Sequence, residues 1–248
     1  MKHFNRKTQM SKLKITTQKS KLVVIVMGPP GSGKGTQAEL LAERLNLYYL
    51  ETSKVLEANI MKAKKGDYVI AEGKKYSLLE EKRSWESGKL VSPILTAFWM
   101  REKIKTLAKK NQNLVLAGSP RSLDEGKRIM PLLKRLYGFK NIKIILLEIT
   151  PEETIFRNSH RRICELMRHP ILYSRETIKL SRCPLDGSKL LKRGKLDKPE
   201  TIKVRLKEYK ERTFPLIDYF KKESLKVIKI NGSPPPAVVF ESILRTIK

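Results

Sequence analysis

The sequence predicts an α/β fold in which a five-stranded parallel sheet carries helices on both faces. Short apolar, β-branched runs bounded by glycine or proline are typical of strands that are buried on both faces. These runs alternate with segments that have the apolar spacing of helices. A glycine-rich turn, residues 28–35, joins the first run to the first of these segments. In such a sheet, ligands bind at the carboxyl ends of the strands.

The strands and helices can be placed in order along the chain. The first strand, residues 22–27, is entirely apolar, and helical spacing follows from near Lys34 to Leu45. Proline at position 151 is typical of the first turn of a helix. The other strands are expected at 48–51, 113–117, 142–149 and 226–230. The other helices are expected at 54–64, 74–87, 93–110, 122–137, from 151 onwards, at 200–221 and at the C-terminus.

Two segments lie outside this alternation. Residues 1–20 are polar and basic, which predicts a disordered or loosely helical tail. Residues 163–198 lose apolar periodicity and gain proline, glycine, cysteine and charge, which predicts an inserted lobe. Residues 21–248 then form one domain that includes this lobe, a reasonable size for a single α/β unit with insertions.

The glycine-rich turn has the composition of an anion-binding loop. Glycines allow positive φ and let backbone N–H groups approach an anion, and the start of a helix adds its positive dipole end. Lys34 follows Gly33 and can reach the outer phosphates of a nucleotide. In the general phosphate-binding pattern a hydroxyl residue follows the lysine, whereas Gly35 stands here and Thr36 comes one place later. The loop therefore predicts nucleotide phosphate binding.

Composition excludes several classes of protein. The chain is 40% hydrophobic and has no apolar run near the length of a membrane span. Its two cysteines cannot form a disulfide scaffold, and the N-terminus has no secretory apolar region. We therefore expect a soluble, cytoplasmic protein without membrane contact.

The charge is unusually positive. The chain has 53 Lys and Arg against 25 Asp and Glu, a net charge of +28. Residues 1–21 hold seven of the basic residues and no acid, and residues 157–195 hold eleven against three acids. The excess fits either a generally basic protein surface or contact with a polyanion such as RNA. The tail lacks the interleaved aromatic residues that favour single-stranded RNA.

Several motifs in order resemble those of the adenylate kinase family of nucleoside monophosphate kinases. The loop reads GPPGSGKGTQ, which is the family's own P-loop variant with glycine after the lysine. The other matching segments are GKLV at 88–91, GSPRS at 118–122, RNSHRRIC at 157–164, the lid exit at 183–193 and 200–206, and ING at 230–232.

The resemblance implies a P-loop NTPase fold with two additions and a reaction. The additions are a helical region of about 51–91 that binds the monophosphate and a mobile lid of about 163–198. The reaction is transfer of the terminal phosphate of ATP to AMP, which gives two ADP, with Mg²⁺ accompanying ATP. Such transfer depends on positioning and on neutralising the charge of the moving group. A monomer is expected.

The family's functional residues carry over to three overlapping sets of positions. The expected catalytic residues are Lys34, Arg121, Arg161, Arg193 and Arg205. The expected ATP-binding residues are Gly31, Ser32, Gly33, Lys34, Gly35, Thr36, Arg157, Arg161 and Pro234. The expected AMP-binding residues are Thr52, Glu57, Lys89, Leu90, Val91, Gly118, Arg121, Glu125, Arg193 and Arg205. Arginine suits these roles because its planar fork grips a phosphate through two hydrogen bonds.

The acceptor side and the metal site depart from the family pattern. Glu57 stands where the family has a phosphate-binding arginine, so it should repel a monophosphate unless Lys54 or Lys89 compensates. Glu125 replaces the glutamine that reads the acceptor adenine, and an ionised carboxylate cannot donate to a ring nitrogen. Ala117 replaces an aspartate that anchors hydrated Mg²⁺. These changes leave the acceptor base open.

The lid holds an incomplete version of a zinc motif that some family members have. Cys164 and Met167 stand for the first pair of ligands, and Cys183 and Asp186 for the second. Methionine is a poor zinc ligand, and a closed structural site needs four donors. His169 is close enough in sequence to replace it. We expect no bound structural zinc and a lid that is held by packing.

Two hypotheses follow. The first is a nucleoside monophosphate kinase of the adenylate kinase type, because the donor motifs are complete. The second is a kinase-like protein of low transferase activity that binds RNA or ribosomes through its basic surface, because of the +28 charge and the changes at Glu57 and Ala117.

Overall fold

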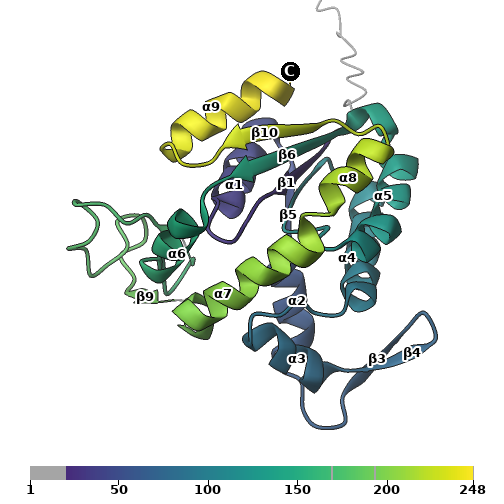
Figure 1. Cartoon of the computed structure of the whole chain (residues 1–248), viewed down its shortest axis with the longest axis horizontal. Coiled ribbons are helices and arrows are strands. Elements are labelled where there is room, and N and C mark those ends of the chain that lie inside the picture. Colours follow the sequence, from purple (N-terminus) through teal and green to yellow (C-terminus); the bar gives the residue numbers. More distant parts are fainter. Residues whose placement is uncertain (1–20, 169, 193, 248) are drawn as a thin grey trace, which may run out of the picture.

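The computed structural model describes residues 21–168, 170–192 and 194–247 (Figure 1). The predicted basic tail, residues 1–20, and the candidate residues His169 and Arg193 lie outside this part of the chain.

A five-stranded parallel sheet forms the centre of the described chain, which confirms the predicted fold class. The strands run in the order β10-β6-β1-β5-β2. Because β1 lies in the middle, the loop that follows it opens at the centre of the carboxyl edge. The strands are β1 (Val23–Met27), β2 (Tyr48–Glu51), β5 (Leu114–Ala117), β6 (Ile142–Glu148) and β10 (Val227–Asn231).

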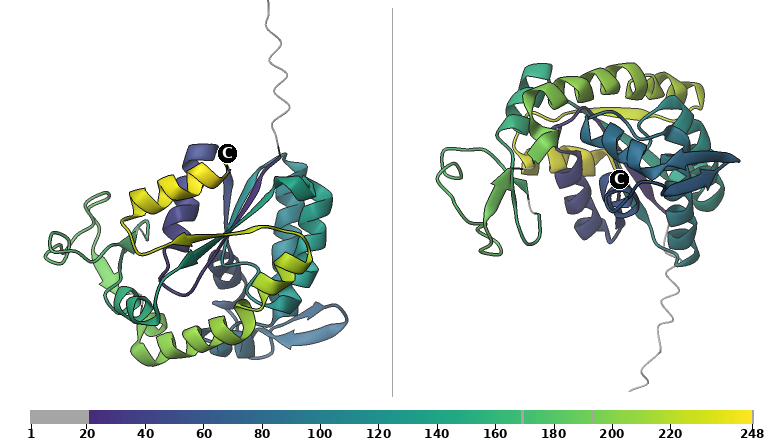
Figure 2. Two further views of the ribbon diagram at one scale, coloured as in Figure 1. Left: turned by 45° about the horizontal axis from the view of Figure 1, so that its top comes forward. Right: turned by 90° about the horizontal axis from the view of Figure 1, so that it is seen from below.

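Helices cover both faces of the sheet (Figure 2). Side chains alternate along each strand, so Ile25 packs on one face and Val24 and Val26 on the other. The face of Ile25 is covered by α4 (Pro93–Lys109), α5 (Leu123–Tyr137) and α8 (Leu216–Lys222), and the other face by α1 (Lys34–Leu45) and α9 (Pro236–Ile247). Burial on both faces explains why the strands are continuous apolar runs. No helix in the described ranges is long and apolar enough to cross a membrane.

The segment from 51 to 91 differs from the expected pair of helices. It consists of α2 (Thr52–Ile60), an antiparallel hairpin of β3 (Tyr68–Ala71) and β4 (Lys74–Ser77), and α3 (Leu78–Glu86). The prediction of a helix at 74–87 was therefore wrong for residues 74–77, which form strand β4. Glu72 and Gly73 have φ of 52° and 75°, the values of a two-residue hairpin turn. The hairpin projects from the body of the molecule (Figure 1).

The predicted inserted lobe is a small antiparallel sheet. Strand β7 (Arg162–Cys164) lies between β8 (Pro170–Ile171) and β9 (Leu190–Lys192). The lobe begins after α6 (Pro151–Ser159) and ends before α7 (Pro199–Glu208), and Figure 1 shows it beside these helices, away from the central sheet. Short 3₁₀ helices occur at Phe139–Asn141 and Gly194–Asp197.

The predicted helix at 200–221 is interrupted. Residues Tyr209–Thr213 form a π-helical turn between α7 and α8, in which the Phe214 N–H donates to the Tyr209 carbonyl at 2.9 Å. Pro215 follows at once, and a proline inside a helix has no N–H to donate and clashes with the preceding turn. The π turn points the Thr213 hydroxyl at the Arg121 carbonyl, 2.5 Å away.

Candidate functional site

The main cleft lies at the carboxyl edge of the sheet, where parallel α/β folds bind ligands. It has a volume of about 740 Å³. The last residues of three neighbouring strands, Met27, Glu51 and Ala117, line its floor. Residues from the glycine-rich loop, from α2, from the lid and from the turn after β10 form its walls. The cleft therefore joins all the segments that the motifs singled out.

The glycine-rich loop is built for close backbone approach. Gly28 has φ of 146°, and a Cβ at this position would lie 2.5 Å from the Leu147 carbonyl oxygen. Gly33, with φ of 89°, caps α1 and has free space where a side chain would be. The Ser32 hydroxyl is buried, and no hydrogen-bond partner is described for it. The loop presents backbone N–H groups and the start of α1 to the cleft, as anion binding requires.

Lys34 lies across the mouth of this loop. Its Nζ donates to the carbonyls of Gly28 at 2.8 Å and Pro29 at 2.7 Å. The ammonium is thus already placed at the loop, on the first residue of α1. A bound phosphate chain would compete with the two carbonyls for this group.

Two lid-side arginines point to one place. Arg161, after α6, lies 3.7 Å from the Asp197 carboxylate, and Arg205, on α7, lies 3.6 Å from it. The Asp197 side chain is only 6% exposed, and both its oxygens lack a described hydrogen bond. Its charge is balanced by the two guanidinium groups at ion-pair distance. Asp197 therefore holds both arginines at the rim of the cleft, where an anionic ligand can meet them.

Arg157 organises the turn after β10. Its guanidinium donates to the carbonyls of Gly232 at 3.0 Å and Ser233 at 2.9 Å and pairs with Glu153 at 2.5 Å. Pro234, next along this turn, also lines the cleft. These contacts tie α6 to the C-terminal turn and leave a partly exposed, planar cation at one end of the cleft.

Arg121 is held at the other side, just after β5. Its Nε donates to the Gly118 carbonyl, and its own carbonyl accepts from Thr213. Its backbone N–H donates to the Glu125 carboxylate at 2.8 Å. The guanidinium lines the cleft, where it can meet an acceptor phosphate.

Glu125 is nearly inaccessible, at 2% exposure, and closes a small second cavity of about 10 Å³. Besides the Arg121 N–H, it bonds the Ser119 hydroxyl, and its own N–H donates to Ser122 in a capping arrangement at the start of α5. Burial raises the pKa of the Glu125 carboxyl, although both hydrogen bonds and the charge of Arg121 oppose that shift. The carboxyl of Glu125 thus holds the turn at Ser119 and Arg121, whereas its backbone N–H takes part in the start of α5.

Replacing Glu125 by glutamine should change how stability depends on pH. A raised pKa means that the folded chain keeps this proton to higher pH than the unfolded chain. Stability from this group is therefore present below the ordinary pKa of 4.5 and declines as pH rises toward the folded value. The decline is at most about 1.4 kcal/mol per pH unit. Urea unfolding of wild type and E125Q between pH 4 and 8 checks this, and parallel curves would contradict it.

The cleft contains most of the residues that the motifs predicted. Those that line it are Gly31, Ser32, Gly33, Lys34, Gly35, Thr36, Glu57, Lys89, Leu90, Gly118, Arg121, Arg157, Arg161, Arg205 and Pro234. Val91 and Glu125 line the small second cavity, which Arg121 and Leu90 share. Thr52 is fully buried at the start of α2 and lines neither space.

Three site residues were missed at the level of sequence. Asp197 binds the two arginines described above. Glu208 on α7 accepts from the Leu90 N–H at 3.1 Å and pairs with Arg212. Arg168, in the lid, lines the cleft opposite α2. The only sequence signal for Asp197 was an acidic residue just after the basic stretch 157–195. The order of residues does not show which basic side chains it contacts.

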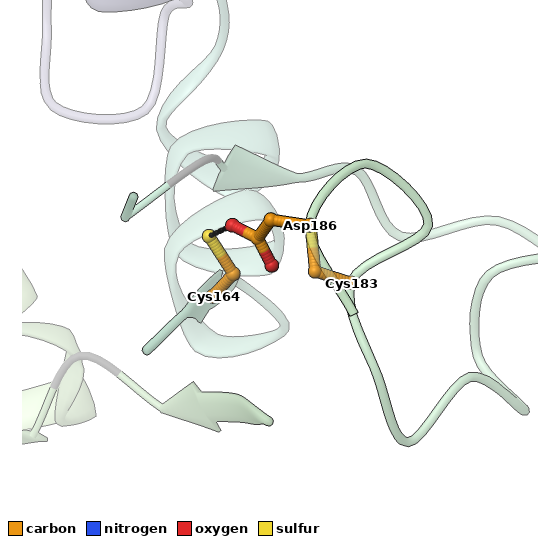
Figure 3. A group of neighbouring side chains, drawn as sticks. All are labelled: Cys164, Cys183 and Asp186. Atoms are coloured by element: carbon orange, nitrogen blue, oxygen red, sulfur yellow. Dashed lines mark hydrogen bonds between the residues drawn. The ribbon is translucent and has the colours of Figure 1, made fainter. Parts of the chain in front are cut away.

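The lid contains a three-residue cluster (Figure 3). Within the described ranges, Cys164, Cys183 and Asp186 offer ligand atoms within 4.8 Å of one another. The Cys164 thiol donates to Asp186 at 3.0 Å, and this bond lowers the pKa of the Asp186 carboxyl. Met167 is 62% exposed and lines the cleft. Three donors do not fit a closed four-ligand zinc site.

Changing Met167 to cysteine should create the missing fourth ligand. The variant is expected to bind about one zinc per chain and to lose thermal stability when a chelator removes it, because structural zinc stabilises the fold that binds it. The wild type should hold much less zinc and melt at the same temperature with or without chelator. Elemental analysis and melting curves check both statements. One tightly held zinc in the wild type would contradict them and point to His169.

Comparison with known proteins identifies the family. The family model for adenylate kinase matches residues 26–225, which include the loop, the lid and most of the residues that line the cleft. The chain belongs to the adenylate kinase family. Named adenylate kinases resemble it over most of their length. One from Chlamydia trachomatis is 33% identical over 236 residues, covering 92% of this chain and 91% of that protein.

Relatives from distant organisms give the same result. An adenylate kinase of Borrelia turicatae is 35% identical over 225 residues, covering 90% of this chain and 98% of its own. One of Methanothrix thermoacetophila is 30% identical over 229 residues, covering 90% and 97%. The family expected from the motifs is thereby confirmed. These matches give no support to the alternative of an RNA-binding protein of low activity.

Proposed function

We propose that this chain is a nucleoside monophosphate kinase that transfers the terminal phosphate of ATP to AMP and yields two ADP. The observation that carries the proposal is one cleft that joins a phosphate-binding loop with Lys34 to Arg121 on the opposite side. Arg161 and Arg205 extend from the lid side toward the same space. Such an arrangement supplies positive charge along the whole path of a phosphoryl group.

The donor and acceptor halves take different roles. The loop amides and Lys34 hold the outer phosphates of ATP, and Arg157 with Pro234 flanks its base. Arg121 grips the acceptor phosphate through its planar fork. Arg161 and Arg205, held by Asp197, neutralise the charge that develops during transfer.

The lid excludes water when it covers the nucleotides. Ile163, Met167 and Ile171 from the lid line the cleft, so the roof of the site is largely apolar. Water that entered would accept the phosphoryl group in place of AMP and waste ATP. Lid closure therefore sets selectivity for transfer over hydrolysis.

Mg²⁺ is proposed as the companion of ATP. Oxygen donors that suit this ion line the cleft beside the loop, namely the Thr36 hydroxyl and the Glu51 carboxylate. Glu51 is the register partner of Ala117, so its carboxylate extends from the neighbouring strand at the same level. When bound, Mg²⁺ would supply positive charge that neutralises the phosphates. Thr36 and Glu51 would orient the waters that surround it.

A coupled assay of the purified chain with Mg-ATP tests the proposal. AMP, CMP, UMP and GMP are offered as acceptors in parallel, because Glu125 replaces a glutamine in the family's base-reading position. Turnover with AMP above the other acceptors is the expected result. Absence of turnover with every acceptor would refute the kinase function, and preference for another base would refute AMP as the substrate.

A further inference from the structure

An ion pair joins the lid to α2 across the cleft. The Arg168 guanidinium lies 3.9 Å from the Glu57 carboxylate, and both side chains line the cleft. Glu57 is on α2, whereas Arg168 is on the turn between β7 and β8. The two residues are 111 positions apart, so only the placement of the lid over the 51–91 segment brings them together.

The lid turn is shaped to present Arg168 in this direction. Arg168 has φ of 59°, a conformation rarely adopted by residues other than glycine, and its N–H donates to the Cys164 carbonyl at 3.1 Å. Cys164 is itself anchored by its bond to Asp186. The turn therefore brings Met167 and Arg168 to the cleft.

Glu57 needs such a partner. Its side chain is 26% exposed and faces a space that must admit a phosphate dianion, which an unpaired carboxylate repels. Lys54, one turn earlier on α2, pairs with Glu51 at 3.5 Å. A cation that arrives with the lid can balance Glu57 without permanently filling the open cleft.

We propose that Arg168 is a positioning residue that neutralises Glu57 when the lid closes, so that the acceptor phosphate can bind beside Arg121. The inference rests on the kinase function proposed above. It makes lid closure and acceptor binding interdependent, because Arg168 reaches Glu57 through the placement of the lid over the 51–91 segment. Arg168 acts here through Glu57 and not on the reacting atoms.

A double-mutant cycle separates this role from general loss of charge. In R168A the carboxylate of Glu57 is left unpaired, and the KM for AMP should rise about tenfold, with a much smaller change in the KM for ATP. In E57Q no charge needs balancing, so adding R168A to E57Q should change the KM for AMP little. The control R175A removes an exposed lid cation that does not line the cleft and should leave every constant unchanged.

Additive effects of R168A and E57Q on the KM for AMP would overturn the proposal. The reversed pair E57R/R168E adds a second criterion, since it should recover most of the affinity that R168E alone loses. If E57R/R168E does not recover this affinity while E57R alone is as active as wild type, the proposal is also contradicted.

A fluorescence measurement keeps this result distinct from failure of the kinase function. Dyes on K62C, near α2, and K179C, in the lid, report the distance between the two segments without turnover. If the wild type turned over no acceptor, the kinase proposal would fail, yet the ion pair would still predict that R168A and E57Q both lengthen this distance. An unchanged distance in both variants would then reject the ion pair itself.

Discussion

Substitution of Lys34 by methionine is expected to lower kcat about 10²–10³-fold, the usual effect of removing one preorganised donor to a developing charge. Lys34 begins α1, and its Nζ already lies at the loop, within 2.8 Å of two carbonyls. The charge therefore needs little reorganisation when a nucleotide binds. Methionine keeps the length and the apolar stem but cannot donate.

Steady-state kinetics with varied ATP and saturating AMP measure this effect. The fall should appear in kcat, because the ammonium acts most strongly on the charge that forms during transfer. K109M, a change at the exposed end of α4 outside the cleft, serves as the control and should behave as wild type. A Lys34 variant with wild-type kcat would show that another group neutralises the donor phosphates.

Replacement of Arg121 by lysine is the second large effect that we expect. Lysine keeps the charge but loses the planar fork, so kcat/KM for AMP should fall about 10²-fold, and the alanine variant should fall further. Thr213 and Glu125 fix the backbone of Arg121, and the Gly118 carbonyl accepts from its Nε, so the guanidinium is held at one place in the cleft. The KM for ATP should change little.

Initial rates with varied AMP at saturating ATP test this statement. R135K, at an exposed position on helix α5, is the matched control because it makes the same chemical change away from the cleft. Equal losses for ATP and AMP would mean that Arg121 supports the whole cleft and not the acceptor half. Full activity of R121K would mean that a simple positive charge is sufficient.

The pattern of apolar residues predicted the elements of the central sheet correctly where both faces of a strand are buried. Residues 144–147 are apolar and buried because β6 is covered on both faces, and the observed strand, 142–148, closely matches the expected one. Prediction was wrong at residues 74–77, where a hairpin turn at Glu72 and Gly73 reversed the chain before the helix began. Their side chains show no clear alternation, so packing against the body of the protein decides their structure.

The phosphate-binding loop of the donor half could be read from the chain because it is contiguous. Residues 28–37 form a strand end, a loop and a helix start, and each step depends on neighbours in sequence. The acceptor half could not be read in this way. Glu125 was expected to face a base, yet its carboxylate accepts from the Arg121 amide and its own N–H donates to Ser122, which caps α5. Both contacts depend on how the chain turns after β5.

The amino-acid sequence by itself determined the α/β class, the family and the phosphate-binding loop, because glycine freedom, apolar runs and helix starts are local properties. The tertiary structure alone decided the partners of the charged residues. Asp197 with its two arginines, and Glu57 with Arg168, are brought together by the lid and its neighbouring helices. Ion pairs depend on distances of a few ångströms in space, and a chain with 53 basic residues offers too many candidate partners for sequence to choose among them.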